Sequence, residues 1–175
     1  SGGMTKYLVD LHPERIEETV AMELALYESG DRCVASIVEA ADDKTAICIV
    51  SDHGAKAAMN EFHVNDALAQ AGLVVYKPGT HEVDWSRTKA SEQRTVYVYV
   101  NTKGRDPQGI VEPGEEYEQV VQQVLDALHD YREPKTGLKP ITLALTREDA
   151  RFIHLDHPKS GDVIYAVDPR FGKEH

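Results

Sequence analysis

The spacing of apolar residues changes along the chain, and the changes predict where helices and strands alternate. Apolar residues three or four positions apart predict helices over residues 13–41, 64–71 and 113–132. Gly30 interrupts the first of these patterns and is expected to bend or break that helix. Gly72 follows the second and is expected to cap its C-terminus.

Short runs rich in apolar and β-branched residues predict the strands. They cover residues 45–54, 73–76, 94–101, 141–145 and 163–167. Residues 77–93 are polar and predict a long loop that contains Trp85. Thr146 is expected to begin a short helix through Phe152. The alternation of helices and strands predicts an α/β fold, with a mostly parallel or mixed sheet flanked by helices.

The run from Thr45 to Val50 ends in Ser51, Asp52, His53 and Gly54. A continuous apolar run is typical of a strand buried on both faces, and ligands of open α/β sheets bind beyond the carboxyl ends of such strands. Asp52 and His53 would lie at that end, and this pair of side chains suits zinc or manganese. By itself, the tetrapeptide is also typical of an ordinary turn after a strand.

Length, charge and cysteine content narrow the class of protein. The 175 residues correspond to one domain, and residues 1–3 resemble an expression remnant, which leaves 4–175 as a single α/β domain. Thirty acidic against nineteen basic residues give a net charge of −11, which argues against nucleic acid or anionic membranes as partners.

Cys33 and Cys48 lack metal or redox spacing and are interpreted as reduced core residues of a cytoplasmic protein. No signal-peptide pattern and no apolar stretch of membrane-spanning length is present in the sequence.

Several separated motifs resemble those of one family in their order and spacing. They are Ser51–Gly54, Val83–Ala90, Tyr99–Val111, Pro113–Tyr117, and Gly161–Tyr165 followed by a terminal His175. Together they resemble predicted phosphohydrolases of the alkaline phosphatase superfamily, in its type I phosphodiesterase and nucleotide pyrophosphatase branch. The resemblance covers the chain from about Tyr27 onward.

The resemblance implies an enzyme in which two divalent metals, zinc or manganese, surround a Thr or Ser nucleophile. It assigns Asp52 and His53 as ligands of one metal and His175 as a ligand of the other. The implied substrate is a small-molecule phosphate ester, either a monoester or a diester.

The chain also departs from the family pattern. The nucleophile and a first Asp ligand stand far upstream of the Asp-His motif in the family, yet only 51 residues precede Asp52. A further ligand pair is spaced D-x-x-x-H, whereas Asp10 and His12 have the wrong spacing. The chain is therefore interpreted as the C-terminal portion of a larger catalytic domain, inactive alone and without a catalytic residue of its own. A non-catalytic binding or assembly module that retains the fold, and a phosphomutase, are the alternatives.

Other polar residues have two interpretations each. Lys103 and Arg105 lie in a glycine-containing loop suited to an anion, although solvated or structural roles are favoured. Trp85 would line a pocket or pin its loop to the core. His154, Asp156 and His157 are ligand-type side chains, but the following Pro158 favours an ordinary loop.

Overall fold

The computed structural model describes residues 12–52, 54, 60–93 and 96–172. The chain divides into two compact units, Ser1–Met59 and Asn60–His175, and each is described by itself. No helix in the described part is both long enough and apolar enough to cross a membrane.

The first unit is dominated by one long helix. A single 3-10 turn, η1 (Pro13–Arg15), leads into α2 (Ile16–Ala40). Proline suits the first turn of a helix, and Glu17 and Glu18 place negative charge at the positive end of α2. The predicted helix is confirmed, but it runs unbroken through Gly30, since one glycine costs only about 1 kcal/mol relative to alanine within a long helix.

The predicted strand from Thr45 to Gly54 is wrong. Residues 45–50 form no strand, and the side chains of Ile49 and Val50 are 76% and 88% exposed. A strand is completed by hydrogen bonds to a neighbouring strand, and the described residues of this unit contain no other strand. The prediction that Cys33 and Cys48 are core residues is also wrong, because both are exposed and α2 buries none of its residues.

The second unit is built on a four-stranded sheet of order β2-β3-β5-β4. The strands are β2 (Ala90–Gln93), β3 (Tyr97–Val100), β4 (Ile141–Thr146) and β5 (Val163–Val167). All neighbouring pairs in it are antiparallel. A separate pair, β1 (Asn60–Glu61) and β6 (Phe171–Gly172), is parallel. The predicted α/β class, with a mostly parallel or mixed sheet, is confirmed in its mixed form, because β1 and β6 pair in parallel and the main sheet is antiparallel. Its adjacent strands β4 and β5 are joined without the long crossover helix that parallel neighbours require.

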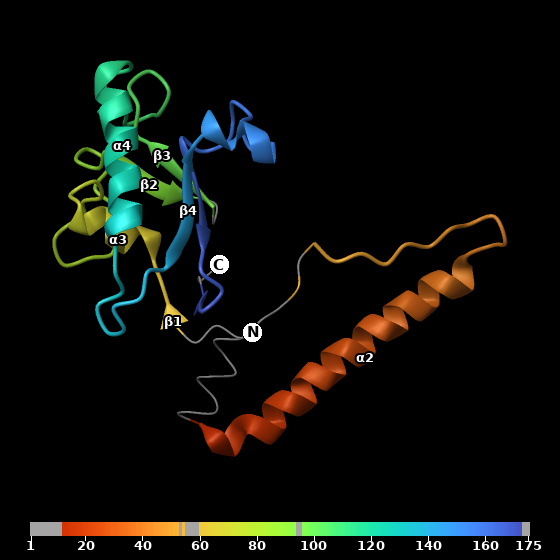
Figure 1. The fold of residues 1–175 in the computed structure, drawn as a ribbon. Coiled ribbons are helices and arrows are strands. Elements are labelled where there is room, and N and C mark those ends of the chain that lie inside the picture. Colours follow the sequence, from red (N-terminus) through yellow and green to blue (C-terminus); the bar gives the residue numbers. More distant parts are fainter. Residues whose placement is uncertain (1–11, 53, 55–59, 94–95, 173–175) are drawn as a thin grey trace. The chain divides into compact units, whose positions relative to one another are not determined.

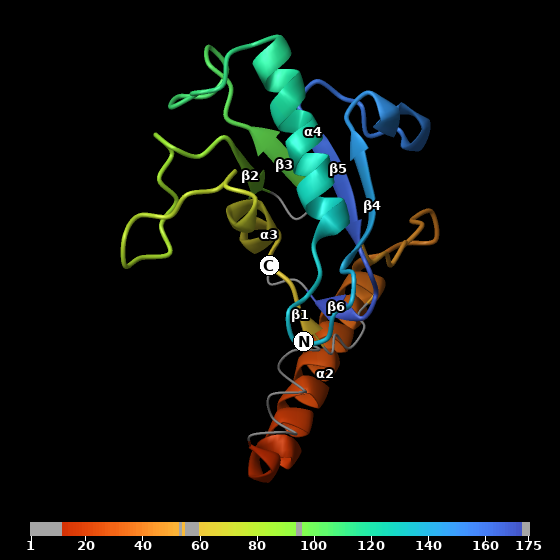
Figure 2. The ribbon, with the colours of Figure 1, turned by 60° about the vertical axis from the view of Figure 1, so that its left-hand side comes forward.

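One helix covers a face of this sheet. In Figures 1 and 2, α4 (Glu115–Asp130) lies across β3, β4 and β5. Its buried side chains recur at helical spacing and enter the core. They are Val120, Val121, Val124 and Leu128. α3 (Val64–Gln70) packs beside α4, and Gly72, at φ 73°, follows its end in the left-handed conformation expected of a glycine cap.

Two further segments differ in detail from their predictions. Residues 73–76 form no strand; Leu73 and Val74 are buried, and Tyr76 makes an isolated bridge to Val83. The predicted loop over 77–93 contains β2 at its end. A short helix, η2 (Asp149–Ile153), follows β4 as predicted, but its N-cap is Glu148 rather than Thr146. Thr146 is the last residue of β4, and its hydroxyl accepts a hydrogen bond from Asp149 N at 3.0 Å.

Candidate functional site

The predicted metal ligands lie mostly outside the described residues. His53, His175 and Asp10 belong to that outside group, whereas Asp52 is described and exposed. His12 is described as well, and one of its ring nitrogens lies 3.1 Å from a carboxylate oxygen of Glu14. Within the described part of the chain, no three His, Cys, Asp or Glu side chains gather in a way that suits a metal. The assignment of Asp52, His53 and His175 as ligands therefore stays a prediction.

The His154, Asp156 and His157 segment is an ordinary loop. His154 follows η2 in the left-handed conformation, at φ 59°. The Nδ1 atom of His157 accepts a hydrogen bond from Lys159 N at 3.1 Å, which closes a local turn. These roles confirm the interpretation of the segment as a loop.

The strongest polar constellation of the second unit surrounds Asp162, whose side chain is completely buried. Arg105 donates from Nη1 to Oδ1 and from Nη2 to Oδ2, both at 2.8 Å. Arg147 Nη2 and the Tyr117 hydroxyl donate to Oδ1 at 2.7 and 2.8 Å. We call Arg105, Tyr117, Arg147 and Asp162 the Asp162 cluster. It joins the loop after β3, the helix α4 and the residue after β4 to the start of β5.

Local backbone contacts explain why Asp162 occupies this position. Its N–H donates to Val98 O at 2.9 Å, and Val100 N donates to its Oδ2 at 2.8 Å, so the carboxylate lies along β3. The preceding Gly161 allows this approach, because a Cβ atom there would lie 2.6 Å from Tyr97 Cβ. Gly109 has a similar role in the Arg105 loop, since its Cβ would lie 2.2 Å from Thr102 O. Both glycines are required by close packing.

Hydrogen bonds favour the protonated form of Arg105 within the cluster, and burial favours that of Tyr117. The hydrogen bonds to Asp162 raise the pKa of Arg105. Burial, and then the charge of Asp162, raise the pKa of Tyr117. The cluster has a formal charge of +1, because two guanidinium groups surround one carboxylate. Their N–H groups and the Tyr117 hydroxyl provide hydrogen bonds to both carboxylate oxygens of Asp162.

The Arg105 side chain donates its hydrogen bonds to other groups of the protein. Besides Asp162, it donates to Val100 O and, from Nε, to Asp106 Oδ2. Lys103 pairs with Glu112 at the surface, and that hydrogen bond raises the pKa of Lys103. Both side chains therefore make contacts within the protein, as the favoured structural interpretation expects.

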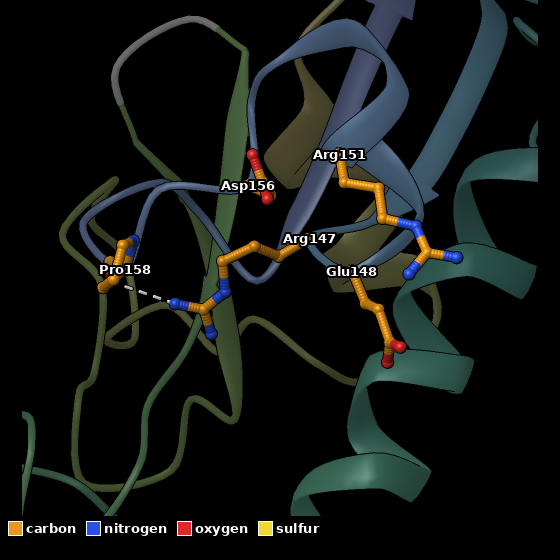
Figure 3. Close-up of a pocket in the computed structure, with 5 residues that line it drawn as sticks. All are labelled: Arg147, Glu148, Arg151, Asp156 and Pro158. Carbon is orange, nitrogen blue, oxygen red and sulfur yellow. Dashed lines mark hydrogen bonds between the residues drawn. The ribbon is translucent and has the colours of Figure 1, made fainter.

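A hollow of about 450 Å³ lies beside the cluster. Arg147, Glu148, Arg151, Asp156 and Pro158 line it (Figure 3). Arg147 Nη1 donates to Pro158 O at 3.0 Å, and the guanidinium groups of Arg147 and Arg151 point away from each other. The two arginines and two carboxylates of this wall converge on no common point, which is unlike an anion site.

A second cavity, of about 200 Å³, lies between the loop before β2 and the loop after β3. Trp85, Tyr99, Asn101 and Asp106 are among the residues that line it. Trp85 therefore lines a pocket, one of the two roles expected for it. Asn101 Nδ2 donates to the carbonyl oxygens of Trp85 and Gln108, which holds the two loops together.

Sequence reasoning missed Asp162 as the centre of the polar network. The available signal was a Gly-Asp pair before an apolar strand, within one of the motifs that carry the family resemblance. Its partners Arg105 and Arg147 stand 57 and 15 residues away, so residue spacing alone does not connect them.

The sequence matches the model of one protein family over most of its length. Residues 22–172 match the model described as type I phosphodiesterase / nucleotide pyrophosphatase. Searches of curated proteins and of solved structures returned no significant match. The matched range includes most of α2, Asp52, the Asp162 cluster and both cavities.

Proposed function

Since the chain belongs to the type I phosphodiesterase / nucleotide pyrophosphatase family, we propose that it forms part of a metal-dependent phosphoric ester hydrolase. The substrate would be a small-molecule phosphate monoester or diester. The observation that carries this proposal is the family match across residues 22–172, which agrees with the mixed α/β fold of an alkaline phosphatase-like domain.

The ligand assignments belong to this proposal. Asp52 supplies a carboxylate and His53 an imidazole to one divalent metal, zinc or manganese, and His175 supplies an imidazole to a second. The exposure of Asp52 leaves it accessible to a metal, and the oxygen and nitrogen donors of the set are chemically suitable for these ions. Metals of this kind polarise phosphoryl oxygens and lower the pKa of a bound hydroxyl.

The nucleophile, a Thr or Ser, is proposed to come from a segment outside these 175 residues. Apart from His175, the second unit is proposed to contribute architecture rather than metal ligands or reacting groups. Its Asp162 cluster fixes the loops on either side of β3 and β5, which bear the motifs shared with the family. Alone, the chain is proposed to be inactive.

The test uses the protein encoded with its upstream region. Metal content and hydrolysis of chromogenic phosphate monoesters and diesters are measured with zinc or manganese, for the parent protein and for Asp52→Asn. Loss of a ligand should lower metal affinity and activity at least as much as loss of a supporting partner, which costs about 10- to 100-fold. Asp43→Asn is the matched control, because Asp43 is an exposed carboxylate in the turn before the same segment.

The outcomes separate the alternatives. Full metal content and full activity in Asp52→Asn would show that the assignment is wrong. A longer protein that binds no metal and hydrolyses no ester would instead support the non-catalytic module. Intramolecular transfer of the phosphoryl group, seen in the products, would identify a phosphomutase.

A further inference from the structure

The cavity of about 200 Å³ in the second unit has the composition of a small-ligand site. Its wall combines two aromatic residues, Trp85 and Tyr99, with polar side chains. The polar residues are Gln93, Asn101, Asp106 and Gln108. Ligand sites typically pair apolar surface with a few placed polar groups in this way.

Asn101 is held in one orientation by the protein. Its Nδ2 lies 3.0 Å from Trp85 O, 2.9 Å from Thr88 O and 2.9 Å from Gln108 O. Only the NH₂ group of an amide donates, so three carbonyl acceptors define which side of the amide is nitrogen. The residue is 6% exposed, and no donor in the described part of the chain pairs with its Oδ1. Asn101 is therefore a rigid, nearly buried residue whose side-chain amide oxygen, Oδ1, is available as an acceptor.

Asp106 supplies a second available acceptor. Its Oδ2 accepts hydrogen bonds from Thr102 N at 2.8 Å and from Arg105 Nε at 3.1 Å. Its Oδ1 accepts no hydrogen bond from the described residues. The adjacent guanidinium balances the carboxylate, so this part of the wall is close to electrically neutral.

These features select among ligand classes. An anion would meet the Asp106 carboxylate, and the attraction of that carboxylate for an organic cation is weakened because Arg105, which lies outside the cavity lining, already pairs with it. A neutral hydroxyl group can donate to the oxygens of Asn101 and Asp106 and can accept from the amide NH₂ groups of Gln93 and Gln108. The C–H face of a saturated ring suits the negative face of an aromatic ring.

We propose that this cavity binds a neutral polyhydroxylated ring of the pyranose sugar class. The aromatic residues supply the apolar surface for the ring, and Asn101, Asp106 and Gln108 supply hydrogen bonds to its hydroxyl groups. This binding is separate from phosphoester hydrolysis and does not depend on it.

The test uses the whole 175-residue chain and the methyl glycosides of glucose, galactose and mannose. Trp85 is the only tryptophan of the chain, so its fluorescence reports directly on the cavity. Saturation-transfer NMR shows which ring protons contact the protein. We expect saturable binding of at least one glycoside, with a Kd on the order of millimolar for a ligand of this size.

Variants distinguish a site from weak surface binding. Gln108→Ala should weaken binding roughly two- to tenfold, as expected for the loss of one hydrogen bond. Gln119→Ala, on the exposed surface of α4, is the matched control and should not change it. Trp85→Ala, followed by NMR, should abolish binding, while the hydrogen bond from Asn101 to the backbone carbonyl of residue 85 remains available. Circular dichroism verifies that each variant is folded.

Three results would overturn the proposal. The first is the absence of saturable binding for all three glycosides up to roughly 100-fold above the expected millimolar range. The second is equal affinity in Gln108→Ala and Gln119→Ala, or retained affinity in folded Trp85→Ala. The third is saturation of the cavity by adenosine or choline when no glycoside binds, which would assign it to a nucleobase or an organic cation.

Discussion

Replacement of Asp162 by asparagine tests whether the Asp162 cluster holds the second unit together. The carboxylate accepts five hydrogen bonds, two from Arg105 and one each from Arg147, Tyr117 and Val100 N. Asparagine has nearly the same size but only one acceptor oxygen, and its NH₂ group would face N–H and O–H donors. Two guanidinium groups would also lose their only buried counter-charge among the described residues.

Removal of one member of a buried ion pair typically costs about 3–5 kcal/mol. The side chains of Arg105 and Arg147 are 38% and 26% exposed, so water can solvate them in part after the replacement. We therefore expect Asp162→Asn to lower the free energy of unfolding by about 3 kcal/mol, the low end of this range.

Urea unfolding followed by Trp85 fluorescence measures this loss, because the single tryptophan lies in the second unit. Glu82→Gln is the matched control, since Glu82 pairs with Lys77 at 2.8 Å but its side chain is 70% exposed. Exposed pairs contribute roughly 0–1 kcal/mol. A loss below about 1 kcal/mol in Asp162→Asn, comparable with that control, would refute the argument that the cluster is a stabilising centre.

Two further predictions concern the same unit. Gly161→Ala should destabilise it by about 1–3 kcal/mol, because the added Cβ would lie 2.6 Å from Tyr97 Cβ. Gly30→Ala, whose Cβ would meet nothing within 4 Å, should leave the tryptophan-monitored midpoint unchanged; equal midpoints for both variants would contradict the packing argument. Burial and then Glu92 raise the pKa of Tyr165. As the pH rises, the Tyr165 hydroxyl therefore loses its proton at a lower pH in the unfolded chain than in the folded chain. Its contribution to the free energy of unfolding is complete below about pH 10 and declines as the pH rises further. Tyr165→Phe should flatten that alkaline decline in urea midpoints measured against pH, and an unchanged slope would contradict the assignment.

Much of the secondary structure follows from local pattern. The helices α2, α3 and α4 were predictable because their apolar positions recur every three or four residues and because Pro13 and Gly72 mark helix ends. The strands β3, β4 and β5 were predictable from runs of β-branched and aromatic residues. The family resemblance also rests on motifs within the sequence, and the match across residues 22–172 confirms it.

The positions and surroundings of the candidate site residues were harder to predict from local sequence patterns. Asp52 was selected because it follows an apolar run, yet residues 45–50 form no strand in the structure. The pocket around Trp85 was one of two interpretations, and only the contacts of Asn101 with both neighbouring loops establish how its wall is held.

The sequence by itself therefore determined the helices α2, α3 and α4, the strands β3, β4 and β5, the acidic charge and the family. Only the tertiary structure decided that the main sheet is antiparallel, that residues 45–50 lack a strand partner, and that Asp162 meets two arginines. The physical reason is the range of the interactions. Helix periodicity and turn chemistry act over a few residues, whereas strand pairing and buried charge depend on neighbours that are distant along the chain and are chosen only when the core packs.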